Sequence, residues 1–221
     1  MKELLKNKIK VRKDCQIKAD IDLPGDGWSH LTLEADNESI IIIISELYEN
    51  GLTHLVRVLC EMHPDFSKYA VGDYLSNYDD NSEGDEKQIL YATKFKWNGE
   101  GIDTNVVIRK AEYLSETDDW VLDINIDMQG LREQIFTKQV LYKDLCYALS
   151  AAYTKVFKEY GITGVNHRVW GLKNGLFDIL FLKAIALDCI DIFTCIHSKN
   201  GETEALLAKE MELLACDCSL T

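Results

Sequence analysis

The sequence predicts a single α+β domain, in which helices pack on one face of an antiparallel sheet of about five strands. Three observations lead to this prediction. The 221 residues are 47% hydrophobic and 28% charged, which is typical of a globular protein with a sizeable core. Segments in which apolar and polar residues alternate are separated by turn residues, as in hairpins. Other segments carry apolar residues at helical spacing, and only two prolines interrupt the chain.

The first predicted elements are a hairpin and a helix. Residues alternate from Trp28 to Leu33, and the β-branched run Ile40 to Ile44 predicts a second strand, buried on both faces. Ser45 is a candidate cap for a helix that ends before Pro64. Gly51 costs this helix about 1 kcal/mol relative to alanine, so the helix depends on packing. Its apolar stripe consists of Leu52, Leu55, Val56, Leu59 and Met62.

The middle of the chain predicts a surface loop and three strands. The polar stretch Gly72 to Lys87 is typical of a loop. Ile89 to Trp97 and Ile102 to Ile108 flank turn residues that suit a hairpin. Trp120 to Met128 alternates, with carboxylates on one side, so we expect a strand with one dry face and one wet, acidic face.

The last third of the chain predicts helices. Thr137 is the expected start of a long helix, and Gly161 stands where a helix-ending glycine is expected. Gly175 to Asp188 favours a buried helix, with a strand as the alternative. Thr203 to Cys216 predicts a further helix, so that residues 171–221 form a helical C-terminal extension of the domain. The long helix has the stripe Leu141, Leu145, Leu149, Ala152 and Val156, widened by Tyr142, Cys146, Tyr153 and Tyr160, and the last helix has Leu206, Leu207, Met211 and Leu214 on one side.

The charge of the chain is strongly uneven. The net charge is -13, and residues 1–18 carry +5, so residues 19–221 carry -18. Residues 1–18 are therefore expected to form a basic segment at the periphery of the domain. Two acidic blocks without an intervening basic residue predict either a solubilising surface or a docking surface for a basic partner. The candidate partner-binding residues are Asp79, Asp80, Glu83, Asp85 and Glu86 in the first block, and Glu116, Asp118 and Asp119 in the second.

The same composition bears on the class of protein and its compartment. A strongly acidic surface repels phosphates, which argues against a general nucleic-acid binder. The seven cysteines are scattered and odd in number, as in a protein with reduced thiols. The N-terminus lacks the apolar region of a secretory signal, and the apolar stretch Ile179 to Leu187 is too short to cross a membrane. We therefore expect a cytoplasmic protein without a membrane partner.

The sequence contains no motif that specifies an enzyme. Nucleotide-binding, zinc-protease and hydrolase signatures are absent, and no cofactor is expected. Cys60 and His63 have the C-x-x-H spacing of two zinc ligands, and Cys216, Cys218 and His197 could complete such a site. The stronger interpretation is that Cys60 is a small core residue and that His63 lies at a helix end, so no metal site is predicted.

The order of the predicted elements resembles the immunity and immunity-like proteins that are encoded beside bacterial polymorphic toxins. The resemblance covers roughly Gly27 to Trp170 and rests on Gly27-Trp28, the isoleucine strand that runs into Ser45-Glu46-Leu47, the Trp97 hairpin, the acidic third strand, and the long helix that ends at Glu159-Tyr160-Gly161. It implies non-enzymatic binding and masking of a cognate toxin. It transfers no contact residue, because no motif marks a toxin-facing position.

The sequence thus favours a non-enzymatic acidic protein that binds and neutralises a basic protein partner. A toxin that acts on nucleic acid must present basic side chains, which an acidic partner can block. Two alternatives remain: a small hydrolase or metal-dependent enzyme with a spatially assembled Cys, His and Asp site, and a structural or regulatory homo-oligomer.

Overall fold

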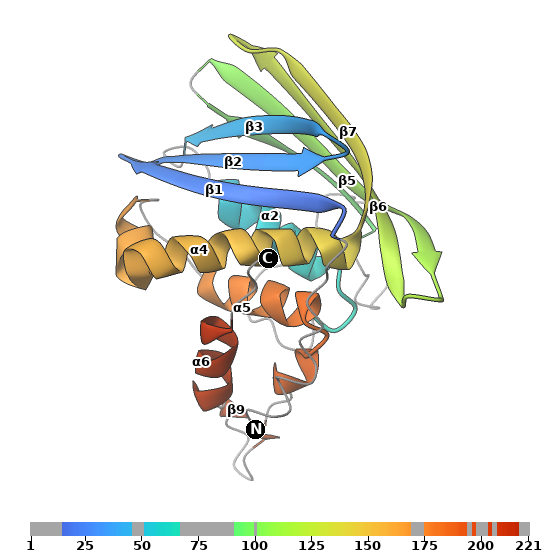
Figure 1. Cartoon of the computed structure of the whole chain (residues 1–221), viewed down its shortest axis with the longest axis vertical. Helices are drawn as coiled ribbons and strands as arrows, with labels where there is room; N and C mark the ends of the chain where they lie inside the picture. Colours follow the sequence, from blue (N-terminus) through green and yellow to red (C-terminus); the bar gives the residue numbers. More distant parts are fainter. Residues whose placement is uncertain are drawn as a thin grey trace, which may run out of the picture.

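The fold combines antiparallel sheets with helices, which confirms the predicted α+β class (Figure 1). The computed structural model describes residues 15–45, 51–66, 91–99, 101–168, 175–193, 196–197, 203–204 and 207–216. Within these ranges the strands form a three-stranded sheet, a four-stranded sheet and a short two-stranded pair. The prediction of one sheet with about five strands is therefore matched only roughly.

The three-stranded sheet has the order β1 (Ile17–Gly25), β2 (Trp28–Ala35) and β3 (Glu38–Ser45). β1 was not predicted, although its buried residues alternate from Ile17 onwards. The expectation that the isoleucine strand is buried on both faces is wrong. Ile40, Ile42 and Ile44 are buried on one face, whereas Ile41 is 37% exposed on the other, where none of the described helices covers this sheet.

The four-stranded sheet has the order β4 (Ala92–Asn98), β5 (Ile102–Leu114), β6 (Asp119–Gly130) and β7 (Gln134–Leu141). The predicted hairpin and third strand are confirmed as β4, β5 and β6. The predicted helix start at Thr137 is wrong, because this residue lies inside β7. Phe136 and Val140 of β7 are buried four residues apart, a spacing that suits a strand face as well as a helix turn.

Of the described helices, two pack against the sheets and two lie farther from them (Figure 1). α4 (Tyr142–Arg168) crosses beneath the three-stranded sheet next to β1, and α5 (Gly175–Ala186) packs against both α4 and α2 (Gly51–Glu61). The predicted apolar stripe of α2 is buried, and Leu145, Leu149, Ala152 and Val156 of α4 are buried as well. Leu141, which was assigned to the same stripe, instead ends β7 and is half-buried.

Two glycines have conformations or contacts that explain their positions. Gly161 has φ +67°, which ends the first regular segment of α4, although helical turns resume as far as Arg168. Gly51 lies so close to β3 that a Cβ atom there would be 2.2 Å from Cγ2 of Ile44 and 3.3 Å from the ring of Trp97. The glycine that weakens the helix is therefore required by the packing of α2 against the sheet.

The C-terminal elements are a 3₁₀ turn (Ile190–Phe193), the two-stranded pair β8 (Ile196–His197) and β9 (Thr203–Glu204), and α6 (Leu207–Ala215). α5 is a helix buried on all sides, so the helical prediction for this segment is confirmed. In α6, Leu214 packs against the core as predicted, whereas Met211 is 55% exposed and Leu213 is buried instead, so the predicted apolar side is matched only in part. The predicted helical start at Thr203 is wrong, because Thr203 and Glu204 form β9.

The two larger sheets are joined by polar contacts as well as by a common core. Lys138 of β7, whose side chain is 9% exposed, pairs with Asp36 at 3.6 Å and with Glu38 at 3.1 Å. Gln134 donates a hydrogen bond to the carbonyl oxygen of Ser39 at 2.6 Å. These contacts hold the β2–β3 turn on β7, while the buried residues of both sheets and of the helices form one apolar cluster.

Candidate functional site

The end of the β5–β6 hairpin projects beyond the N-terminal end of α4 (Figure 1). We call residues 110–120 the hairpin end. The strand register shifts between Lys110 and Glu112, which places a β-bulge at Ala111. Ala111, Glu112 and Tyr113 are consecutive exposed residues, so side chains on both faces of β5 reach solvent here. Both faces of the sheet are therefore open to solvent at this segment.

Two of the three candidate carboxylates of the second acidic block lie on this surface. Glu116 and Asp118 are exposed in the turn that joins β5 to β6, and Glu112 is exposed just before it. No lysine or arginine occurs between Lys110 and Arg132 in the sequence, whereas six carboxylates do. The hairpin end therefore carries locally unbalanced negative charge.

Asp119 has a structural role, and its assignment to a partner-binding surface is corrected. It is 1% exposed, and its Oδ1 atom accepts hydrogen bonds from the backbone N–H groups of Trp120 at 2.8 Å and Lys143 at 3.2 Å. The N–H of Lys143 lies in the first turn of α4, where backbone donors have no partner within the helix. A carboxylate there satisfies a donor and complements the helix dipole, so Asp119 attaches the hairpin to α4.

Three aromatic rings and one lysine form a cluster at the base of the hairpin end. The ring of Trp120 lies 6.0 Å from that of Tyr91 and 5.2 Å from that of Tyr113, between ring centroids. The Nζ atom of Lys110 lies 5.2 Å from the centre of the Tyr91 ring and 5.0 Å from that of Trp120. It also donates a hydrogen bond to the carbonyl oxygen of Met62 at 2.6 Å. We call Tyr91, Lys110, Tyr113 and Trp120 the aromatic cluster.

The aromatic cluster is partly open to solvent and partly fixed. Tyr91 is 55% exposed and Tyr113 is 47% exposed. The hydroxyl of Tyr113 donates a hydrogen bond to Oδ1 of Asp118 at 2.6 Å, which raises the pKa of the tyrosine. Burial lowers the pKa of Lys110 to about 8. The sequence placed Tyr91 and Trp120 in two predicted strands but did not indicate that these strands are close in the sheet, so the cluster was missed.

The carboxylates on the outer face of the four-stranded sheet differ from those of the hairpin end, because neighbouring side chains on the sheet donate hydrogen bonds to them. The predicted wet face of β6 is confirmed, and Asp123 accepts a hydrogen bond from Gln139 at 2.9 Å. Asp127 accepts one from Gln129 at 2.7 Å. These carboxylates are matched by neighbouring amides on the same sheet. The first acidic block, Asp79, Asp80, Glu83, Asp85 and Glu86, lies outside the described residues.

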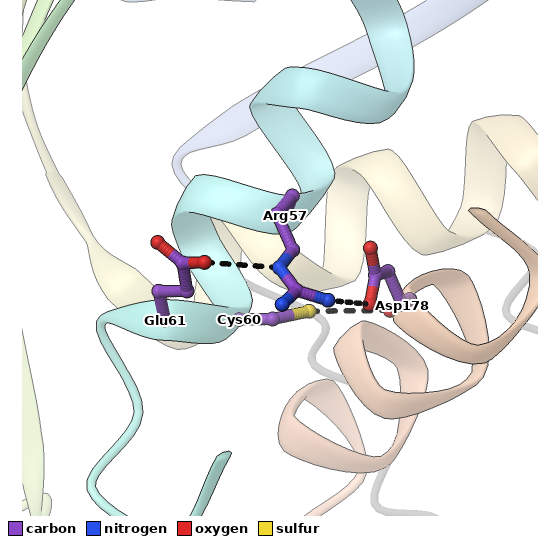
Figure 2. Close-up of polar contacts among 4 residues, drawn as sticks. All are labelled: Arg57, Cys60, Glu61 and Asp178. Atoms are coloured by element: carbon purple, nitrogen blue, oxygen red, sulfur yellow. Dashed lines mark hydrogen bonds and ion pairs between the residues drawn. The ribbon is translucent and has the colours of Figure 1, made fainter. Parts of the chain in front are cut away.

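A buried ion cluster joins α2 to α5 (Figure 2). Nε of Arg57 lies 2.9 Å from Oε1 of Glu61, and Nη1 lies 3.1 Å from Oδ1 of Asp178. The side chains of the two acids are only 2% and 6% exposed. The guanidinium also lies 4.7 Å from the centre of the Phe66 ring. Burial raises the pKa of Asp178 to about 6, although the nearby guanidinium acts in the opposite direction.

The cysteine and histidine of the C-x-x-H spacing have packing roles in this region. The Cys60 thiol donates a hydrogen bond to the backbone carbonyl of Asp178 at 3.2 Å, and complete burial raises its pKa well above the ordinary value (Figure 2). It is therefore held as a thiol, which is a poor nucleophile. The ring of His63 packs edge-on against Phe181, and its Nδ1 accepts the N–H of Asp65. These contacts indicate that Cys60 and His63 connect α2 to α5 and have a structural role.

Other groups with potential chemistry are dispersed over the fold. His54 stacks on Phe95 at 4.7 Å and burial lowers its pKa, whereas His30 lies 3.6 Å from Asp22 at the surface. Across the described ranges, no group of three or more His, Cys, Asp or Glu side chains is arranged to hold a metal ion. In the same ranges, no helix is long and apolar enough to cross a membrane. The five cysteines placed by the structure are thiols rather than disulfides: Cys15, Cys60, Cys146, Cys189 and Cys216.

The hairpin end is therefore the candidate site, with the exposed carboxylates Glu112, Glu116 and Asp118 and the adjoining aromatic cluster. Comparison of the chain with protein-family models, with curated proteins and with solved structures found no match in any of the three.

Proposed function

We propose that this protein is a non-enzymatic binding protein that neutralises a basic protein partner, in the manner of a toxin immunity protein. The observation that carries the proposal is the projecting hairpin end, which carries three exposed carboxylates, Glu112, Glu116 and Asp118, together with the exposed ring of Tyr113. Tyrosine and tryptophan are the side chains most often found at the energetic centres of protein interfaces. Negative charge on the same segment favours a partner of positive charge.

The electrostatics of the whole chain support the same conclusion. Residues 19–221 carry -18, so the long-range field attracts a cationic protein and speeds its encounter with this surface. The exposed carboxylates of the hairpin end then act at short range, where they set the orientation of the partner. The first acidic block, residues 79–86, belongs to the proposal on its sequence alone. A cytoplasmic location follows as part of the same proposal, since a toxin that acts on nucleic acid must be blocked where its target is.

The mechanism requires masking and no chemical step. An interface of standard size covers about 800 Å² on each partner, which is enough to occlude the basic groove of an enzyme that acts on nucleic acid. The Asp119 contact with α4 and the β-bulge fix the direction of the hairpin before binding. A fixed contact surface loses little conformational entropy on association, which increases affinity.

A pull-down from the native host at low salt tests the proposal. The tagged full-length chain is expected to recover a basic protein that is encoded near its own gene, and elution is expected at moderate salt because the contacts are ionic. A chain in which Glu112, Glu116 and Asp118 are replaced by their amides is the matched control. Recovery of no basic protein, or equal recovery by the control, contradicts the proposal for this surface.

The first acidic block has its own test. Neutral or lysine replacements of Asp79, Asp80, Glu83, Asp85 and Glu86 are expected to slow association and flatten its dependence on salt, with little change in folding. Stopped-flow measurements with the recovered partner provide the rates. Unchanged kinetics would remove this block from the interface and leave the hairpin end as the proposed contact.

A further inference from the structure

Resting on the proposed function, we propose that Tyr113 is the anchor of the interface and that it receives an arginine side chain of the protein partner. The guanidinium stacks on the exposed ring of Tyr113, whose hydroxyl is bonded to the carboxylate of Asp118, and Glu116 is exposed in the same turn. The proposal thus names the chemical group of the partner that the hairpin end recognises.

The rings next to Tyr113 already hold a cation. Nζ of Lys110 lies within 5.2 Å of the centres of the Tyr91 and Trp120 rings. A cation at this distance from an aromatic face is attracted by the electron-rich ring. Tyr113 extends the same group of rings outward, 5.2 Å from Trp120, and is 47% exposed. It therefore offers an incoming cation a further, exposed ring beside the two rings that hold Lys110.

The orientation of Tyr113 is set before a partner arrives. Its hydroxyl donates to Asp118, and Trp120 supports the ring at an interplanar angle of 53°. Asp118 itself has φ +50° in the turn, a conformation that aspartate tolerates better than most residues. A ring held from two sides keeps an open face without losing further side-chain freedom on binding, which is what an anchor residue requires.

Arginine fits this surface better than lysine. Its planar guanidinium stacks on an aromatic ring and at the same time donates to carboxylates at its edge. The ammonium group of lysine is more strongly hydrated, so it loses more when it leaves water for the face of a ring. Nucleic-acid bases also stack on tyrosine, but their phosphates would meet Glu112, Glu116 and Asp118.

Two peptides of equal length and charge test this inference on the full-length chain. One is an arginine–glycine repeat and the other is a lysine–glycine repeat, and calorimetry at low salt measures their affinities. We expect the arginine peptide to bind about threefold or more tightly than the lysine peptide. Y113L is expected to weaken binding of the arginine peptide about 5- to 10-fold, whereas Y113F, which keeps the ring, is expected to stay within about twofold of the wild type.

The controls separate the anchor from the charge and from folding. Y160L removes a tyrosine that holds Arg168 at 4.2 Å on a distant part of α4, and it should leave peptide affinity unchanged. Thermal melts check that each variant is folded. The variant E112Q/E116Q/D118N is expected to weaken both peptides by about tenfold or more.

The outcomes distinguish this inference from the proposed function. If the charge variant weakens binding while Y113L does not, Tyr113 is not the anchor and the proposed function stands. If neither variant changes peptide affinity, both the inference and the assignment of the hairpin end to a basic partner fail. Tighter binding of a single-stranded uridine oligonucleotide than of the arginine peptide would also overturn both.

Discussion

Asp178 is a carboxylate for which burial makes ionisation unfavourable. Its pKa is raised from 3.8 to about 6, so between these pH values the folded chain holds a proton that the unfolded chain has lost. The contribution of this group to stability is therefore greatest at or below about pH 4 and decreases as the pH rises through 6. In D178N the group no longer titrates.

This linkage gives the first prediction. The unfolding free energy of the wild type relative to D178N is expected to rise by up to about 2 kcal/mol when the pH falls from 7 to 4. Urea unfolding of both proteins at several pH values measures this difference. A difference that does not depend on pH would show that the Asp178 carboxylate is not perturbed as the structure implies.

Arg57 compensates two buried carboxylates, and its removal tests how much the ion cluster contributes. R57M leaves Glu61 and Asp178 at 2% and 6% exposure without the guanidinium between them. We expect a loss of about 3 kcal/mol in unfolding free energy at pH 7, and a smaller loss at pH 5, where Asp178 is protonated. K96M is the matched control, because Lys96 and Asp103 form a pair that is about half exposed, and its loss should stay below about 1 kcal/mol. Equal losses in the two variants would contradict a buried ion cluster.

Adding one methyl group at residue 51 tests how closely α2 packs against β3. Alanine at position 51 favours a helix by about 1 kcal/mol over glycine, but its Cβ would overlap Cγ2 of Ile44. G51A is therefore expected to destabilise the protein by about 1–3 kcal/mol, as overpacked cores do. Urea unfolding measures the loss.

A double mutant identifies the cause of that loss. Because I44A removes the overlapping methyl group, the loss in G51A/I44A should be clearly smaller than the sum of the two single losses. Additive losses would mean that the close contact between α2 and β3 does not limit residue 51.

The type of an element could be predicted where its apolar residues followed a single period. α2 and the β4–β5 hairpin have patterns that only one element type fits, and these predictions are confirmed. For α5 the sequence left a strand as the alternative, and the structure shows the favoured helix. β7 failed because Phe136 and Val140 stand four residues apart, and because the leucines of α4 continued the same spacing across the strand–helix boundary. β1 was overlooked because its alternating residues begin within the basic segment 1–18, which was treated as peripheral.

For the candidate site as well, the sequence indicated the features that depend on local pattern and missed those that depend on contacts between distant residues. The sequence indicated Glu116 and Asp118, which are exposed, because a run of charge in a turn points to solvent. It did not separate them from Asp119, whose carboxylate reaches the N-terminus of α4 only after the sheet has formed. The aromatic cluster and the link from Arg57 to Asp178 join residues that lie far apart in the chain, and no local pattern predicts such contacts.

Negative charge is present on several faces of the whole molecule. The proposed function requires that partner binding depends on where the carboxylates lie and not only on the net charge. Asp22, Asp26 and Glu159 are exposed carboxylates near the opposite end of α4, about 25 Å along the helix from the hairpin end. Neutralising them changes the net charge by the same amount as neutralising Glu112, Glu116 and Asp118. The two triple variants therefore separate local recognition from the overall field of the chain.

The most direct test compares the association rates of these two variants with the basic partner recovered from the host, over a range of ionic strength. E112Q/E116Q/D118N is expected to associate about tenfold more slowly at low salt, with a flatter salt dependence, whereas D22N/D26N/E159Q should stay within about threefold of the wild type. Equal slowing in both variants would contradict the account, because the acidic residues would then act only through net charge and the hairpin end would have no special role.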